Sequence, residues 1–439
     1  MPSGISPVIR TLLLAACLCF GPGSAMAQTP ACPASASWIG NQTPPTEIPG
    51  GGQNFCQFYQ FAWQWFLTLT APAPGKPLLR NFEVQQNYPL VQATQNTSCD
   101  ASNLNALHSI FVRTTKPTVG GGKLALPKET GQAGGGATIY DQNGNVVFYE
   151  MRFSRGECTT VSPNNFPANT VELKTSWRIL KLGEPGLDSY YKVVTIIDGV
   201  NNNQPVLLGM LGFHLAVSTA SHPEFVWATF EHKSNSPECL KPEATPTNGW
   251  SFSSASCAAC LASSKSGPPA CNSGSNTCNY NNPPDNSQAL TAAPTNICKV
   301  YRDGSAPTDF KVSENVPVVD SLNLQMVGPK GLLTQLPATN PSAVWKNYKM
   351  DGALWVSNTA QPSGSASGNT TNQRGSLQLA SSVMETAHQG TFTNSATSAP
   401  VRTAATNCFG CHGYPGSGSS NTVVSHIYPG ILPVATGSK

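Results

Sequence analysis

The sequence predicts an α+β fold rich in β-structure, with an antiparallel sheet or sandwich as its core and helices at its periphery. Short stretches of β-branched and aromatic residues follow one another between about residues 105 and 235, with turn residues between them. Only 11% of the 439 residues are charged, where about 25% is usual, and 39 Gly and 37 Pro are present. This composition excludes a coiled coil, and the 8 Trp and 17 Phe exclude a disordered chain.

The β-rich part contains one hairpin signal and four further strand candidates. Residues 136–140 and 146–149 flank the turn sequence Asp-Gln-Asn-Gly-Asn, which is typical of a hairpin. The other candidates are Val171–Leu180, Tyr190–Ile197, Pro205–Val217 and Phe225–Glu231.

Three segments have helical character. Residues 53–70 are dense in aromatic side chains and predict a buried helix that stops at Pro72. Residues 341–356 are predicted to be helical. Residues 357–376 form a Ser/Gly/Asn/Thr linker, and the apolar positions in residues 377–389 share one helical face.

The N-terminus has the pattern of a signal peptide. Arg10 precedes the apolar run Thr11–Phe20, and Ala25-Met26-Ala27 has the form of a cleavage site. We expect cleavage after Ala27, so that residues 1–27 are removed and the mature protein is periplasmic or extracellular. The alternative, lipid attachment at Cys17, has only a short apolar stretch before it. No later run reaches the ~20 residues of a membrane-spanning helix.

The fourteen cysteines divide into three groups. Two lie in the signal peptide, two lie in a motif near the C-terminus, and ten remain. Six of the ten fall in a polar insertion at about 233–300 within the main domain, 28–356. An oxidising compartment favours three disulfides there over a zinc site. The other four, Cys32, Cys56, Cys99 and Cys158, would form two more, with connectivity left open.

The C-terminal motif carries the chemistry. Cys408-Phe409-Gly410-Cys411-His412 is the C-x-x-C-H pattern of covalent haem c attachment, in which two thiols bind the porphyrin and the histidine ligates the iron. The competing interpretations are a Cys408–Cys411 disulfide and a thioredoxin-like motif, but no βαβ pattern flanks it. We therefore predict one haem c, held by Cys408, Cys411 and His412, in a haem-binding segment at 377–439.

The sixth iron ligand is left open by the sequence. No Met follows His412, and His426 is the only downstream His. Met384, on the predicted helix 377–389, is one candidate, with ordinary core packing as its alternative. His388 lies four residues further on. An open sixth position is a further alternative.

Several stretches resemble a family of exported bacterial proteins that carry a single cytochrome-c-like C-x-x-C-H motif near the C-terminus and have no well-established activity. The stretches run through most of the mature chain, and they are Phe61–Leu69, Glu172–Trp177, Leu211–Leu215, Phe225–His232, Trp345–Tyr348, Met384–Thr386 and the haem motif. In the relatives a second His and a Lys follow the strand His, where this chain has Leu215–Ser218.

The resemblance draws attention to His214, Glu231 and His232. His214 lies in an apolar strand, where a polar group needs a partner. It is either a core residue, hydrogen-bonded to backbone or to Glu231, or a distal haem ligand or distal-pocket residue. Adjacent strands could bring Glu231 beside it and fix its tautomer.

Three functions follow from these features. The first is electron transfer by a c-type cytochrome with a redox partner protein that the sequence does not identify. The second is a haem peroxidase or oxygenase that acts on a secreted substrate, with His214 or Glu231 in the distal pocket. The third is a structural or binding protein with haem in a supporting role. A formal charge of +3 gives no indication of nucleic acid as a partner.

Overall fold

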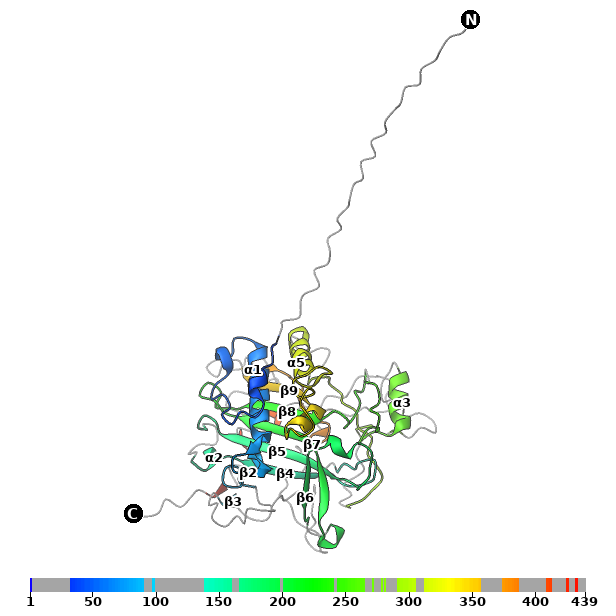
Figure 1. Cartoon of the computed structure of the whole chain (residues 1–439), viewed down its shortest axis with the longest axis horizontal. Helices are drawn as coiled ribbons and strands as arrows, with labels where there is room; N and C mark the ends of the chain where they lie inside the picture. Colours follow the sequence, from blue (N-terminus) through cyan, green and yellow to red (C-terminus); the bar gives the residue numbers. More distant parts are fainter. Residues whose placement is uncertain are drawn as a thin grey trace, which may run out of the picture. The chain divides into compact units, whose positions relative to one another are not determined.

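A seven-stranded antiparallel sheet forms the centre of the fold (Figure 1). Its strand order is β10-β9-β8-β7-β5-β4. The seventh strand, β6, lies off this path and pairs with the first residues of β7. The strands are β4 Phe148–Phe153, β5 Val171–Ile179, β6 Lys192–Thr195, β7 Val206–Val217, β8 Val226–His232, β9 Tyr348–Val356 and β10 Gln373–Gly375.

The computed structural model describes a defined part of the chain. Besides Met1, these residues are 32–90, 97–98, 138–159, 166–197, 200–240, 243–264, 271, 278, 280–281, 290–304, 312–356, 373–386, 408–412, 424–425 and 431–432. The predicted signal peptide after Met1 and residues 357–372 of the predicted linker 357–376 therefore lie outside the described residues, as do His388, His426 and Cys99. The end of that linker is not irregular, because Gln373–Gly375 forms strand β10 against β9.

Four predicted strands are confirmed, because β5 to β8 coincide with the stretches expected from composition. The hairpin turn is also confirmed. The Asp141 amide donates to the Asn145 carbonyl at 2.9 Å, and Tyr140 pairs with Val146 in an antiparallel bridge. The described residues form one large sheet. Of the two predicted forms of the core, a sheet or a sandwich, the structure therefore supports the sheet.

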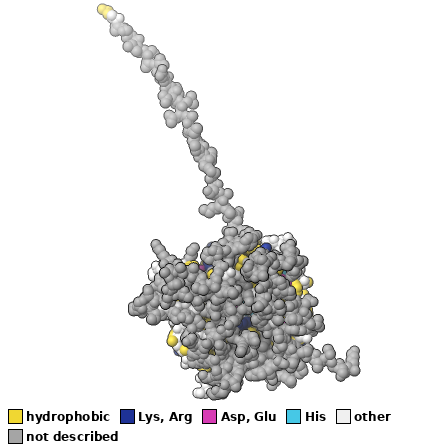
Figure 2. All heavy atoms as spheres, turned by 180° about the vertical axis from the view of Figure 1, so that it is seen from behind, with side chains coloured by type: hydrophobic (Ala, Val, Ile, Leu, Met, Phe, Trp, Pro, Cys, Tyr) yellow, Lys and Arg dark blue, Asp and Glu magenta, His cyan; other side chains and the backbone are white. Residues whose placement is uncertain are grey.

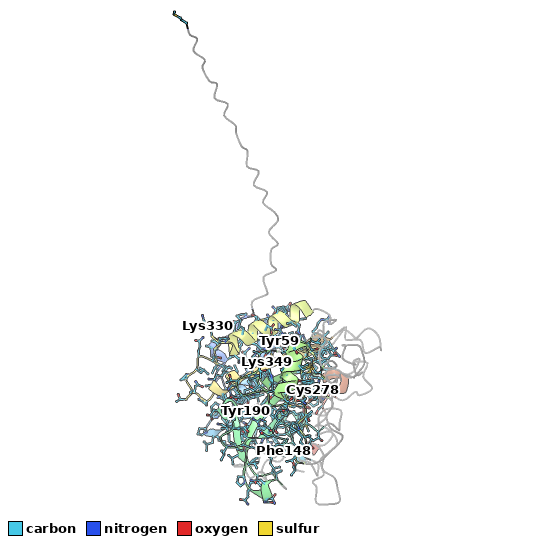
Figure 3. All side chains as sticks on the ribbon, turned by 90° about the vertical axis from the view of Figure 1, so that its right-hand side faces the viewer. Tyr59, Phe148, Tyr190, Cys278, Lys330 and Lys349 are labelled. Carbon is cyan, nitrogen blue, oxygen red and sulfur yellow. A yellow bond between two sulfur atoms is a disulfide. The ribbon has the colours of Figure 1, made fainter. Side chains whose placement is uncertain are left out.

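Two helices cover one face of this sheet (Figure 1). Helix α1, Phe55–Thr70, begins at Asn54, whose side chain accepts a hydrogen bond from the Gln57 amide, and ends before Pro72. Its Phe66 ring stacks on Phe230 of β8 with centroids 4.1 Å apart. The hydroxyl of Tyr59, which Figure 3 labels, donates to Asn315 of helix α5, Val312–Val327. The predicted aromatic helix is therefore confirmed as core.

The remaining elements are short. The α-helical ones are α2 Gly156–Thr159, α3 Ala255–Ser263 and α6 Cys408–Cys411. The 3-10 helices are η1 Ala36–Trp38, η2 Pro49–Gly51, η3 Asn81–Glu83, η6 Leu187–Ser189, η7 Asn201–Asn203 and η8 Ala343–Asn347. Strand β1, Pro72–Ala73, pairs with β2, Lys76–Arg80, and β11, Ile431–Leu432, pairs with β3, Thr97–Ser98.

Two helix predictions are wrong. Within 341–356, only η8 is helical, and Tyr348–Val356 forms strand β9 between β8 and β10. Both faces of β9 are buried, so its sequence lacks the alternation that marks a half-exposed strand. Residues 377–386 contain turns and no α-helix. The Ser381 hydroxyl there accepts from the amides of Val383 and Met384, a local bond that competes with helix.

Disulfides hold the insertion together as predicted. Its six cysteines pair as Cys239–Cys298, Cys257–Cys278 and Cys260–Cys271, so these thiols do not form the alternative zinc site. Cys32–Cys56 is a fourth bond, and Cys158 is also disulfide-bonded. Such bonds are typical of an oxidising compartment.

The described side chains that reach the surface in the rear view are scattered, and no single chemical type gathers there (Figure 2). Leu78 and Leu182 are the most exposed leucines in the described part, at 92% and 88%. Among the described residues, no helix combines the length and the apolar character needed to cross a bilayer.

Candidate functional site

The candidate site lies on the sheet face opposite α1 and α5, which we call the second face. Side chains alternate along each strand, so Phe213, Leu215 and Val217 of β7 join the helix-covered core. Gly212, His214 and Ala216 therefore belong to the second face. The segments around Met384 and Phe409 pack here and bring the C-terminal part of the chain onto the sheet.

The C-x-x-C-H motif forms one helical turn on the second face. Helix α6 spans Cys408–Cys411, and the His412 amide donates to the Cys408 carbonyl at 2.7 Å. Phe409 is 1% exposed and belongs to an apolar cluster that includes Leu377 and Trp227. The His412 ring lies against Trp227, with centroids 4.4 Å apart and planes tilted by 42°. Trp227 of β8 thus packs against both the helical turn and His412.

A backbone hydrogen bond fixes the tautomer of His412. Its Nδ1 lies 2.8 Å from the Val424 carbonyl oxygen, which only accepts, so Nδ1 carries the proton. In the neutral ring the lone pair then sits on Nε2. This is the arrangement of metal-ligating histidines, whose second nitrogen donates to a carbonyl or carboxylate. The predicted axial ligand therefore has the chemistry that iron ligation requires.

The predicted attachment residues are only partly described. Cys408 is half-buried at the edge of the Phe409 cluster. Cys411 ends α6, but its side chain lies outside the described residues. The assignment of haem to the two thiols and His412 stays a prediction.

Met384 is fully buried in a different cluster, with Leu211, Val383 and Tyr149. Its methyl group packs so closely on Gly212 that a Cβ at residue 212 would lie 2.8 Å from it. The structure does not bring Met384 into the cluster that contains Phe409. Its role as sixth ligand stays a prediction, and its packing is that of a core methionine.

His214 has two side-chain partners on the second face. Its Nδ1 lies 2.6 Å from the Thr229 hydroxyl, and its Nε2 lies 3.0 Å from Glu385 Oε2. Burial acts to raise the pKa of Glu385, but the neighbouring His214 and the more distant Lys174 hold it well below its usual range. Glu385 is therefore an anion, and its carboxylate lies next to the Nε2 edge of the His214 ring.

The expected pairing of His214 with Glu231 is not what the structure has. Strand register places Glu231 opposite Gly212 and His214 opposite Thr229, so the two lie two residues apart on the same face. Sequence reasoning reached the correct neighbouring strands and missed Glu385, because the register and the path of 376–386 are tertiary features.

Glu231 is the centre of a buried polar network. The Ser382 amide donates to Glu231 Oε1 at 2.6 Å, and Asn235 Nδ2 and Lys299 Nζ approach Oε2 at 3.2 and 3.4 Å. Lys299 also pairs with Asp351. Burial acts to raise the pKa of Glu231, yet Lys299 and these hydrogen bonds lower it to about 2. Glu231 thus anchors the segment 376–386 to the sheet.

His232, the third residue that the resemblance marks, is buried as a neutral ring. Its Nε2–H donates to the Ser189 carbonyl, its Nδ1 accepts from the Ser234 amide, and Tyr190 stacks on it at 4.1 Å (Figure 3 labels Tyr190). Burial, followed by the charges of Arg178 and Lys233, lowers the pKa of His232 to about 3 despite the bond to Ser189.

The sequence reasoning missed a pair of buried carboxyls, Glu157 of α2 and Glu172 of β5. They are 1% and 7% exposed, and Ser425 donates to Glu157 Oε2 at 3.4 Å. Burial raises the pKa of Glu172 to about 7, and burial and the charge of Glu172 raise that of Glu157 well above normal. The available signal was a Glu within the strand sequence Val171-Glu172-Leu173.

Comparisons with protein-family models, with curated proteins and with solved structures found no match to this chain. The function therefore has to be argued from the residues of the site.

Proposed function

We propose that this chain is an exported c-type cytochrome that carries one covalently attached haem and transfers electrons to or from a partner protein. The observation that carries the proposal is the hydrogen bond from His412 Nδ1 to the Val424 carbonyl. It prepares Nε2 of the motif histidine to ligate iron.

The donor set fits haem c. Cys408 and Cys411 stand three residues apart on one helical turn, and His412 follows directly. Cys408 and Cys411 would hold the porphyrin, and His412 would supply the axial nitrogen. When bound, haem supplies a one-electron couple whose potential depends on the axial ligands, hydrogen bonds and burial. Trp227 and Phe409 would shield one side of the site from water.

Export is supported by two independent features. The N-terminus has the pattern of a cleaved signal peptide, and the described part of the chain contains four disulfides whose partners are both placed. Covalent haem attachment in bacteria also takes place outside the cytoplasm.

The contacts of the proposed distal residues favour electron transfer over catalysis. Both ring nitrogens of His214 face a partner, and the Glu231 carboxylate accepts from Ser382 and Asn235 and pairs with Lys299. A general acid or base must be able to reach a substrate proton. These two side chains serve packing and segment anchoring instead.

Covalent haem is expected in the full chain expressed in a host that matures c-type cytochromes. A pyridine haemochrome assay on the denatured protein should give about one haem per chain, because thioether bonds survive denaturation. The double variant Cys408→Ser/Cys411→Ser should retain none. The matched control Cys260→Ser/Cys271→Ser removes one disulfide and should keep the haem. A wild-type chain without covalent haem would overturn the proposal.

The spectrum of the same protein separates electron transfer from catalysis. A six-coordinate, low-spin iron that is inert to peroxide is expected for an electron carrier. A high-spin iron that binds CO readily and turns over peroxide with a dye would instead support the peroxidase or oxygenase alternative.

A further inference from the structure

The second face carries a group that the proposed function does not use, the buried pair Glu157 and Glu172. No cation forms an ion pair with either carboxyl within the described part of the chain. Two carboxyls in a low-dielectric site cannot both ionise cheaply without such a cation, so the pair retains a proton.

The pair is connected to the haem motif in two ways. Ser425 contacts Glu157, and the preceding residue, Val424, accepts the hydrogen bond from His412. Strand register also places Glu172 opposite Ala216, and Ala216 opposite Trp227, on which the His412 ring lies. Two strand spacings separate Glu172 from Trp227, roughly 10 Å.

We propose that Glu157 and Glu172 form a proton-binding site coupled to the oxidation state of the haem, an inference that rests on the proposed function. When the site gives one electron to a one-electron acceptor protein, its charge rises by one and the affinity of the pair for its proton falls, so that a fraction of a proton is released to solvent. Reduction reverses both transfers, so charge and protons balance.

Groups on β4, β5, β7, β8 and the C-terminal segment support this assignment, and on β4 the residue paired with Glu172 is Phe153, which does not titrate. On β5, Lys174 is the nearest residue of opposite charge along the second face, and its Nζ lies over the Tyr149 ring at 5.4 Å. On β7 and β8 the row carries Ala216 and Trp227, which do not titrate. Ser425 on the C-terminal segment contributes a hydroxyl. The pair is therefore the titrating group of this row.

The coupling has an expected size. When the roughly 10 Å between Glu172 and Trp227 is taken as the separation of the two charges, an effective dielectric constant of about 20 gives a change in proton affinity of about tenfold. For a one-electron couple, tenfold corresponds to about 59 mV. The midpoint potential of the wild-type protein should therefore fall by about 59 mV in total as pH rises through the region around 7.

Spectroelectrochemical titration of the haem-loaded chain from pH 5 to pH 9 tests this. Glu172→Gln and Glu157→Gln should each remove most of the fall. The matched control is Glu83→Gln, a buried carboxyl that bonds Tyr191 on the helix-covered face, and it should keep the fall. A second measurement needs no variant: the redox-induced infrared difference spectrum of the wild type should lose a protonated carboxyl C=O band on oxidation.

The outcomes are distinguishable. A chain without covalent haem overturns the proposed function and the coupling together. A haem-loaded chain whose potential does not change with pH, or whose fall survives in both Gln variants, overturns only the coupling. An unchanged carboxyl band in the infrared spectrum also overturns it, even where the variants fail to fold.

Discussion

Replacing Lys299 with methionine is expected to lower the free energy of unfolding by about 3–5 kcal/mol at pH 7, because it leaves the buried Glu231–Asp351 pair without its cation. Lys299 Nζ pairs with Glu231 and Asp351, whose side chains are 0% and 8% exposed. Burial and the charge of Glu231 already raise the pKa of Asp351 well above normal. Urea unfolding followed by tryptophan fluorescence measures the loss.

A matched surface substitution serves as the control. Lys192→Met removes an ion pair with Asp188, which is 94% exposed, so solvent screens this pair and the free energy of unfolding should stay close to that of the wild type. The two variants remove the same charge and keep a similar side-chain volume. Equal losses of unfolding free energy in both variants would show that the Lys299 network stabilises the fold no more than a surface ion pair does.

The loss in Lys299→Met should also depend on pH. Without the cation, the Glu231–Asp351 pair lowers its buried negative charge by taking up a proton, so the variant is closest to wild type in mild acid. A loss that is the same at pH 5 and pH 8 would contradict this account of the network. Because Glu231 also anchors Ser382, the same substitution weakens the attachment of residues 376–386 to the sheet.

The elements that the sequence predicted correctly are those with a local cause. β-Branched runs formed β5 to β8, and the Asp141–Asn145 turn closed as its residues require. The helix prediction over 341–356 failed for a tertiary reason. Trp345, Tyr348 and Trp355 are spaced as on a helix, but β9 is buried on both sides and lacks a strand-like alternation.

The residues of the candidate site also fall into those that local sequence predicts and those that only the tertiary structure brings together. The C-x-x-C-H turn is readable because its five residues are contiguous. The network of Glu231, Lys299 and Asp351 comes from β8, the end of the insertion and β9, so only strand register assembles it. Glu385 likewise reaches His214 because residues 376–386 abandon the helix that their apolar spacing suggested. Single-sequence patterns contain no information on register between strands distant in the chain.

His232 should make the stability of the protein depend on pH in weak acid. Its pKa is about 3 in the folded chain and about 6.5 when unfolded. A depressed folded pKa means that the unfolded state binds the proton first, so stability is lost as pH falls below about 6.5. Each pH unit in this range removes about 1.4 kcal/mol. The contribution of His232 between pH 6.5 and pH 5 is therefore about 2 kcal/mol.

In the wild type this loss is opposed by buried carboxyls with raised pKa values. One of them is Glu172, whose folded pKa of about 7 lies above its unfolded value, so that its contribution to stability falls as pH rises from about 4.5 to 7. The measurement is therefore a difference between proteins. His232→Gln should be less stable than wild type at pH 7, because it loses the fit against Tyr190, and the gap should narrow by about 2 kcal/mol at pH 5. The free energy of unfolding of Glu172→Gln, relative to that of the wild type, should increase as pH rises over the same interval. A gap between His232→Gln and wild type that stays constant from pH 5 to pH 7 would mean that His232 is not held as a neutral ring.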